Sequence, residues 1–153
     1  VSLVNSDTLQ PTMDVNLIGT GATPKISVMP AMPDFGMVNV GSQSPPLPIT
    51  ISNAGQGNLT VSAITLGGAD AAAFQVATPA LPMIVAPGST RTIAPVFAPV
   101  NVGKANGKLT LVTDDPNTPN IDVPLTGTGL AAMIAVDPTS VDFGSQIVGK
   151  AAR

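Results

Sequence analysis

Residues 49–62 read Ile-Thr-Ile-Ser-Asn-Ala-Gly-Gln-Gly-Asn-Leu-Thr-Val-Ser, two short runs of alternating apolar and polar side chains around a turn. The first run is 49–52 and the second is 59–62. A period of two places one face of each run inward, as in a half-buried β-strand. Gly55 and Gly57, between the runs, are typical turn residues. The stretch therefore predicts two consecutive β-strands.

The second run loses its phase, and a different pattern follows it. Ala63 and Ile64 break the alternation before Leu66, which predicts a β-bulge or a crossing between sheets. Residues 70–74, Asp-Ala-Ala-Ala-Phe, predict one short helical turn with Phe74 as its apolar anchor.

Strand signals extend over the rest of the chain. Sixteen Pro and fifteen Gly separate short runs of Val, Ile, Leu and Thr, and Glu, a strong helix former, is absent. These features predict an all-β fold, an antiparallel β-sandwich of about seven strands. The further predicted strands are 26–28, 38–40, 83–85, 93–97, 108–112 and 121–125.

Three positions carry specific expectations. Phe35 is expected in the core. Pro95 cannot donate to a strand ladder, so its strand should lie at an edge or be disrupted there. Asn106-Gly107 resembles a primed hairpin turn or, alternatively, a bend before the next strand.

The chain also repeats itself. Residues 1–45 align without a gap on residues 109–153, at a constant offset of 108, with 18 of the 45 positions identical. Gly19-Thr20-Gly21 returns as Gly127-Thr128-Gly129, and Asp34-Phe35-Gly36 returns as Asp142-Phe143-Gly144. A period of this length is typical of tandem domains.

The period predicts three parts. Residues 1–21 are the C-terminal strands of a preceding repeat, 22–129 is a complete domain, and 130–153 are the N-terminal strands of a following repeat. The two overhangs together supply only 45 of the 108 positions, and neither replaces residues 46–108. We therefore expect an excerpt of a longer polypeptide; the alternative is that the overhangs strap onto an intact domain, in cis or in trans.

The residue inventory argues against catalysis. The sequence contains no Cys, His, Trp, Tyr or Glu, and all nine acidic residues are Asp. Nucleophilic triads need an imidazole base, and typical zinc sites need His or Cys. We expect no enzyme activity, no catalytic, cofactor-binding or metal-binding residues, and no cofactor.

Charge and composition restrict the partners. A net charge of −3 with 10% charged residues leaves no basic surface for phosphates, and four Phe offer little for bases to stack on. We expect no nucleic-acid partner. No apolar run approaches the roughly 20 residues that cross a bilayer, so no membrane span is expected in this segment. The charge-poor composition, rich in Thr, Ser, Asn, Gly, Pro and Ala, favours a bacterial extracellular or cell-surface protein.

One polar loop offers a candidate metal site. Its oxygen-bearing side chains could bind Ca²⁺ beside a domain junction, but the same residue types cap their own backbone in turns. The first copy of the loop has Ser6 in place of Asp114, so the charge is not repeated and the turn is preferred. The residues are Asp114, Asp115, Asn117, Asn120 and Asp122.

Two modification hypotheses are weaker than their structural alternatives. Asn58-Leu59-Thr60 is a formal glycosylation sequon, but Leu59 is expected to point into the core. Lys25, Lys104 or Lys108 with an Asp and an Asn could form an isopeptide bond, but a β-sandwich with four Lys and nine Asp offers such pairs by chance.

The chain contains an ordered set of spaced motifs. Their residues are Ile26, Val28, Pro30, Asp34-Phe35-Gly36, Val40-Gly41, Ile49, Ile51, Asn53, Gly55, Leu59, Val61, Phe74, Ala86-Pro87-Gly88, Phe97, Pro99, Val102-Gly103, Leu109, Leu111, Asp114-Asp115-Pro116, Val123-Pro124-Leu125, Gly127 and Gly129. Together these motifs resemble those of the ASPM/SPD-2/Hydin domain, whose bacterial form is called a choice-of-anchor D domain. The resemblance implies an immunoglobulin-like sandwich related to PapD and major sperm protein, and it implies no enzyme. Pro95 and the Pro-rich stretch 79–82 depart from the family pattern.

The sequence predicts a structural and interaction repeat of a fibre, filament, stalk or adhesin. Its expected partners are neighbouring repeats and copies of itself. Only eight residues separate Leu17 from Ile26, so the hinge between domains should be short. The alternative function is a glycan- or protein-binding accessory module of a larger secreted protein, which clustered exposed aromatics would favour.

Overall fold

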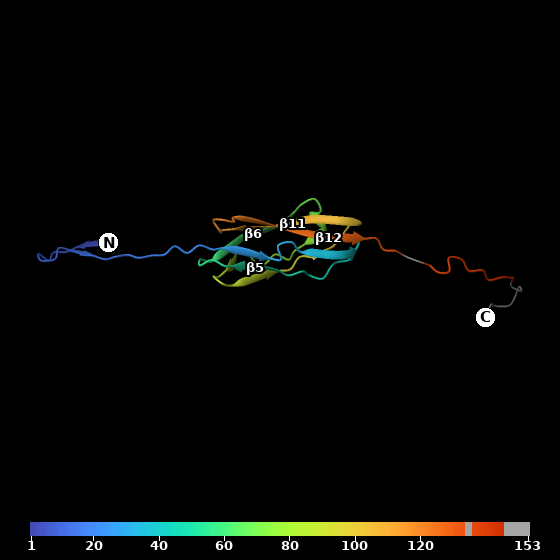
Figure 1. Ribbon diagram of the computed structural model, residues 1–153, viewed down its shortest axis with the longest axis horizontal. Coiled ribbons are helices and arrows are strands. Elements are labelled where there is room, and N and C mark those ends of the chain that lie inside the picture. The colour runs from blue at the N-terminus through green and yellow to red at the C-terminus, as the bar shows by residue number, and fades with distance from the viewer. Residues whose placement is uncertain (134–135, 146–153) are drawn as a thin grey trace.

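Two β-sheets pack against each other between residues 26 and 130 of the computed structural model (Figure 1). The structure describes residues 1–133 and 136–145. The larger sheet has the strand order β4-β12-β11-β6-β8 and the smaller has the order β3-β5-β9. Strands β7 and β10 form a short separate pair, and β1 and β2 form a hairpin outside the sandwich.

The elements lie close to the predicted segments. Neighbouring strands pair antiparallel except β4 and β12, which run parallel, so the predicted antiparallel sandwich is confirmed with one added parallel pair. The elements are β1 (Ser2–Val4), β2 (Thr12–Asp14), β3 (Ile26–Met29), β4 (Asp34–Asn39), β5 (Ile49–Asn53), β6 (Leu59–Gly67), the 3-10 turn η1 (Ala71–Ala73), β7 (Phe74–Gln75), β8 (Met83–Val85), β9 (Thr90–Ile93), β10 (Val96–Phe97), β11 (Gly103–Thr113) and β12 (Asn120–Leu130).

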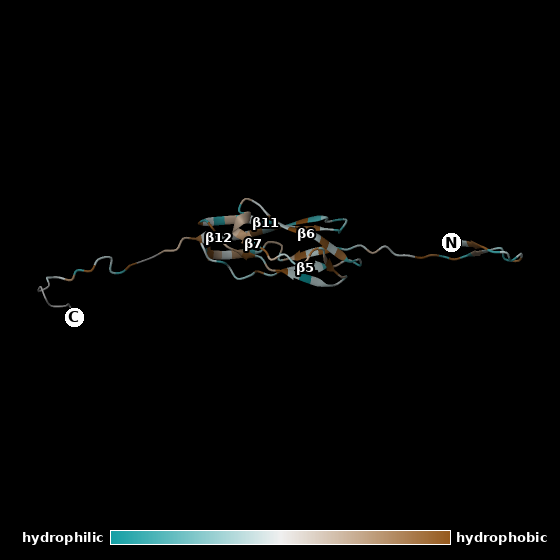
Figure 2. Ribbon diagram, turned by 180° about the vertical axis from the view of Figure 1, so that it is seen from behind, coloured by the Kyte–Doolittle hydropathy of each residue, from teal (hydrophilic) through white to brown (hydrophobic). Residues whose placement is uncertain are grey.

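Apolar and polar residues alternate along the strands (Figure 2), and the buried apolar side chains form the core. Each buried aliphatic side chain stabilises the fold by about 1.5–3 kcal/mol. Phe35, which is partly buried, contacts Phe74 and Phe97 with ring centroids 5.7 and 6.1 Å away, and those two rings are 5.1 Å apart. The buried apolar residues are Ile26, Val28, Ile49, Ile51, Leu59, Val61, Ile64, Ala73, Phe74, Met83, Val85, Ile93, Phe97, Ala105, Leu109, Leu111, Val123 and Leu125.

The irregular positions follow the sequence predictions except at one place. The register of β11 on β6 shifts between Val112 and Thr113, opposite Ala63, so the predicted bulge is confirmed. The predicted helical turn is η1. The predicted strand at 93–97 is interrupted before Pro95, between β9 and β10.

Both alternatives predicted at Asn106-Gly107, a hairpin turn and a bend before the next strand, are wrong. Both residues lie inside β11, which runs without interruption from Gly103 to Thr113. A Cβ on Gly107 would lie 2.7 Å from the ring of Phe74. The glycine therefore makes room for a core aromatic, and it does not form a turn.

The overhangs leave the sandwich on opposite sides (Figure 1). Residues 1–21 lead into β3, and residues 131–133 and 136–145 follow β12. Ile134, Val148 and Gly149, which belong to the sequence repeat, lie outside the described residues. The boundaries 1–21, 22–129 and 130–153 stay predictions. Within the described part of the chain, no helix has the length and apolarity needed to span a bilayer.

Candidate functional site at the two ends of the sandwich

The features that distinguish this sandwich lie at its two ends. We call the end at which the chain joins β3 the proximal end, and the end at which it leaves β12 the distal end. Two shallow depressions, of about 150 and 310 Å³, both lie at the distal end and share the Pro99 to Val100 segment. Within residues 1–133 and 136–145, no three acidic, His or Cys side chains gather to hold a metal ion.

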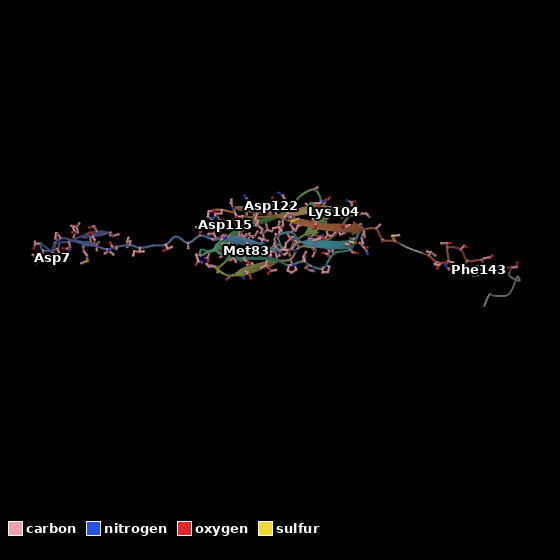
Figure 3. The ribbon with its side chains drawn as sticks, viewed as in Figure 1. Asp7, Met83, Lys104, Asp115, Asp122 and Phe143 are labelled. Carbon is pink, nitrogen blue, oxygen red and sulfur yellow. The ribbon has the colours of Figure 1, made fainter. Side chains whose placement is uncertain are left out.

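At the proximal end, Asp115 fixes the start of β3. Its side chain is 1% exposed, and its Oδ2 accepts the N–H of Ile26 at 2.9 Å while its Oδ1 accepts the N–H of Asn117 at 2.9 Å. Figure 3 shows Asp115 at the side of the sandwich from which the N-terminal segment extends. The hydrogen bond from Ile26 is the main reason that the pKa of Asp115 lies below its ordinary value.

Asn53 binds the backbone of Lys25, the residue before Ile26. Its Oδ1 accepts the N–H of Lys25 at 3.1 Å and that of Gly55 at 2.9 Å. Its Nδ2 donates to the carbonyl oxygens of Gly57 at 2.7 Å and Val85 at 2.9 Å. The side chain is 1% exposed, so these four bonds satisfy a buried amide. Asn53 and Asp115 thus hold two consecutive residues where the chain joins β3.

The loop after Asn53 also forms hydrogen bonds with the chain before Lys25. Gln56 and Gly57 donate their N–H groups to the carbonyl of Thr23 at 2.9 and 3.1 Å. A Cβ on Gly55 would collide with the Thr23 carbonyl, and one on Gly57 would lie 2.7 Å from the Ala22 carbonyl. Glycine is therefore needed at both positions for the backbones to approach, and the chain is fixed from Ala22 onward.

At the distal end, two glycines of β12 allow close contact with Phe97 and Asn101 of the same sandwich. A Cβ on Gly127 would lie 2.7 Å from the ring of Phe97, and one on Gly129 would collide with the Asn101 carbonyl. The Leu130 carbonyl accepts the N–H of Val40 at 2.9 Å. The motif Gly127-Thr128-Gly129 is therefore part of a fixed strand, and the backbone stays bonded to the sandwich up to Leu130.

The distal end also exposes apolar side chains. Val100 is 64% exposed and Val102 is 65% exposed, on the loop that follows β10. Residues 99–103 carry no charge and border the depression of about 150 Å³. The loop offers an uncharged surface that can be covered without desolvating an ion.

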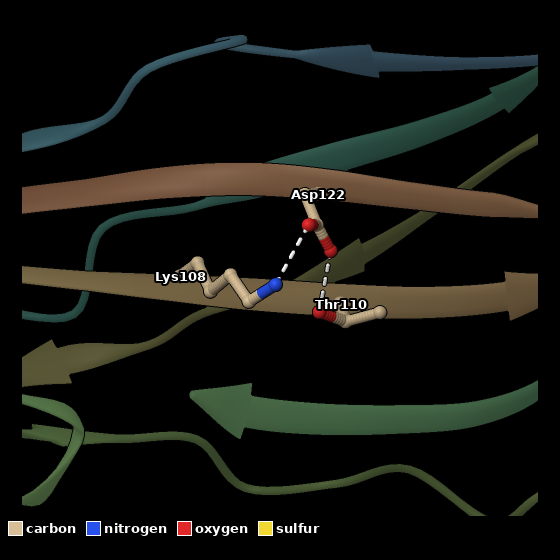
Figure 4. A network of polar contacts seen from close by, with 3 residues as sticks. All are labelled: Lys108, Thr110 and Asp122. Atoms are coloured by element: carbon tan, nitrogen blue, oxygen red, sulfur yellow. Dashed lines mark hydrogen bonds and ion pairs between the residues drawn. The ribbon is translucent and has the colours of Figure 1, made fainter. Parts of the chain in front are cut away.

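The polar residues weighed as calcium ligands against a turn are divided between two environments. Asp114 accepts the N–H of Thr60 at 2.8 Å, and Asp115 accepts backbone N–H groups as described. Asp122 lies farther along β12. It accepts a hydrogen bond from Thr110 at 2.5 Å and forms an ion pair with Lys108 at 2.8 Å (Figure 4). These bonds, with Lys108 first, lower the pKa of Asp122.

The modification candidates are surface residues. Lys25, Lys104 and Asn58 are exposed, and Leu59 is fully buried as predicted. The Lys108 and Asp122 side chains are 47% and 50% exposed, so their ion pair contributes little to stability.

Sequence reasoning missed the buried roles of Asn53 and Asp115. Both side chains also act locally as turn residues, since each accepts an N–H from two residues ahead. The available signals were Gly55 and Gly57 after Asn53, and the return of Asp115 as Asp7 in the first copy. Neither signal indicates which part of the chain each side chain binds.

Comparisons with known proteins bear on the fold alone. No family model and no curated protein matches the sequence. The ASH/PapD-like domain 7 of human CEP192 matches with a TM-score of 0.55 at 13% identity, over 79% of this chain and 96% of that one. The periplasmic chaperone SfaE matches with a TM-score of 0.52 at 7% identity, over 72% of this chain and 61% of that one.

A bacterial protein gives a match of similar quality. It is a protein of unknown function from Porphyromonas gingivalis W83, with a TM-score of 0.56 at 16% identity, over 70% of this chain. The match covers 46% of that protein, so the present chain spans about half its length. The chain therefore has the immunoglobulin-like β-sandwich fold of ASH and PapD-like domains.

Proposed function

We propose that the chain is a non-enzymatic structural repeat, of the choice-of-anchor D type, in a long bacterial extracellular fibre, filament, stalk or adhesin. The observation that carries this proposal is the position of the overhangs. Their sequences repeat two segments of the sandwich, 109–129 and 22–45, with 18 of 45 positions identical, and they leave it at opposite ends (Figure 1). Domains joined in this way extend end to end, so the array gains length with each repeat.

The surface supports contact between repeats and between chains. Only 10% of the residues are charged, and apolar side chains are exposed at the distal end. Such a surface is covered by a neighbour at little cost in ion desolvation. The partners in this proposal are neighbouring repeats and copies of the same protein at the cell surface.

Electron microscopy of the native full-length material tests the proposal. Strands β11 and β12 each have 11 residues, and at ~3.3 Å per residue each repeat should advance a fibre by roughly 35 to 45 Å. An ordered fibre with that axial repeat supports the structural role. Dispersed monomers that retain a sugar or protein ligand on a column contradict it and favour the accessory binding module.

A further inference from the structure

The repeat and the hydrogen bonds at the two ends together define the joint between consecutive domains. At the offset of 108, Leu130 corresponds to Ala22 and Ala131 corresponds to Thr23. Leu130 is the last residue of β12, and its carbonyl is bonded to Val40 of its own sandwich. Thr23 is the residue whose carbonyl accepts the two N–H groups of the 53–57 loop.

Consecutive repeats therefore share the joint without a spacer. The last residue bonded to one sandwich is followed directly by the first residue bonded to the next. The bonds at position 23 involve only its backbone carbonyl, so Ala131 can accept them as Thr23 does. A joint with no free residue has none of the freedom of a flexible linker.

The overhangs show that repeat positions keep their local conformation. The Gly36 N–H donates to Asp34 at 3.1 Å with a φ of 67°, and the Gly144 N–H donates to Asp142 at 2.8 Å with a φ of 62°. The distal glycine motif is also kept in the first copy, where a Cβ on Gly19 or Gly21 would meet nothing within 4 Å. Gly19 and Gly21 correspond to Gly127 and Gly129, whose lack of a side chain makes room for Phe97 and Asn101. They therefore fit a preceding sandwich that contains counterparts of those two residues.

The direct joint brings two specific loops together. The distal loop at residues 99–103 borders the exit of β12, because Asn101 lies against Gly129. The proximal loop at residues 53–58 lies against the residues that correspond to the joint. Neither loop carries a charged residue. Val100 and Val102 are therefore exposed on an uncharged loop beside the joint.

We propose that residues 99–103 of each repeat pack against the loop that corresponds to residues 53–58 in the following repeat of the same chain, making a fixed apolar joint. This inference rests on the proposed function, because it requires a second repeat. It adds that the array is stiff, and it assigns the stiffness to Val100, Val102 and the missing spacer.

Spin-label distance measurements on a two-repeat protein test the joint. The protein consists of residues 1–130 followed directly by residues 23–153, with Thr65→Cys in both repeats. Thr65 is exposed and the sequence has no other Cys, so each repeat takes one label. We expect one narrow distance distribution. Insertion of Gly-Ser-Gly-Ser after Leu130 should broaden it about twofold or more.

Two matched variants separate the joint from general effects. The same insertion between the exposed residues Ala77 and Thr78, in a loop that contributes no residue to either 53–58 or 99–103, should leave the distribution narrow. Val100→Ser with Val102→Ser should broaden it while circular dichroism stays unchanged, because both side chains are exposed. An unmodified protein as broad as the spacer variant overturns the fixed joint, and an unchanged width in the double variant overturns the apolar contact.

The two proposals fail in different ways. A flexible joint in the two-repeat protein would not contradict an ordered fibre in electron micrographs, so only the further inference would be lost. Native material that shows dispersed monomers contradicts the structural role, whatever the width of the distance distribution.

Discussion

The hairpin at residues 2–14 and the hairpin at residues 110–122 share their local structure and differ in burial. The register of β1 on β2 is the register of β11 on β12 at the offset of 108. The loops agree too, since the Leu9 N–H donates to Asp7 as the Asn117 N–H donates to Asp115. Yet Leu3 is 52% exposed and its counterpart Leu111 is fully buried.

The difference separates local from non-local information. Turn residues and alternation set the hairpin and its register in both copies. Burial depends on strands that only the second copy has beside it, chiefly β6, which pairs with β11 at Leu111. An isolated hairpin is marginally stable in water, so the same substitution should have different effects in the two copies.

The largest difference is expected for Leu111→Ala against Leu3→Ala. Leu111 is fully buried between β6 and β12, so its truncation leaves a cavity and should lower the free energy of unfolding by about 2–5 kcal/mol. Leu3→Ala, at a half-exposed site, should change it by less than about 0.5 kcal/mol. Urea denaturation of the 153-residue chain measures both. Equal losses would show that the first hairpin packs on the sandwich.

A second comparison concerns Gly127→Ala and Gly19→Ala. The new Cβ at position 127 would lie 2.7 Å from the ring of the fully buried Phe97, so we expect a loss of about 1–3 kcal/mol from overpacking. At position 19 nothing lies within 4 Å, and unfolding in urea should be unchanged. A stable Gly127→Ala protein would mean that Phe97 can move aside.

The third comparison is Asp115→Asn against Asp7→Asn. The amide at position 115 keeps one acceptor oxygen for two backbone N–H groups, so the N–H of Ile26 or that of Asn117 loses its partner, at a cost of about 1–3 kcal/mol. Asp7, in the exposed hairpin, should tolerate the change. Amide hydrogen exchange gives an independent check, because one of the two N–H groups, Ile26 or Asn117, should lose protection in Asp115→Asn and both should keep it in Asp7→Asn.

Local patterns explain why much of the fold could be predicted. The alternation at residues 49–62 identified β5 and the start of β6, and the phase break at Ala63 identified the bulge. The run at 70–74 identified η1. Each of these signals acts within a few residues of the chain, where propensity and periodicity decide the conformation.

The unpredicted features depend on residues distant in sequence. Asn106-Gly107 resembles a turn because Asn-Gly is a typical turn dipeptide. The ring of Phe74, which explains the glycine, belongs to another element that periodicity does not reveal. The bond from Ile26 to Asp115 joins residues 89 apart, and the bond from Lys25 to Asn53 joins residues 28 apart. The parallel pairing of β4 with β12 is equally non-local. Periodicity carries no information about such pairs.

The smallest expected effect is the pH dependence that Asp115 contributes. Its pKa in the folded chain is below the ordinary value of 3.8, mainly because of the hydrogen bond from Ile26. A carboxyl with a depressed folded pKa stabilises the fold above its unfolded pKa, and this contribution is lost as the pH falls through the folded pKa. The loss should be smaller than in Asp115→Asn, because a protonated carboxyl can donate its proton or turn an acceptor toward the backbone.

Urea unfolding between pH 7 and pH 2 measures this contribution. The unmodified chain and Asp7→Asn should lose stability alike below about pH 4, since Asp115 is present in both. Asp115→Asn should show a shallower decline. Asp122 also has a lowered pKa, through Lys108, but that exposed pair is screened by solvent and should add little. An equally steep decline in Asp115→Asn would assign the acid sensitivity to the other carboxylates. It would also show that the hydrogen bond from Ile26 does not depend on the charge of Asp115.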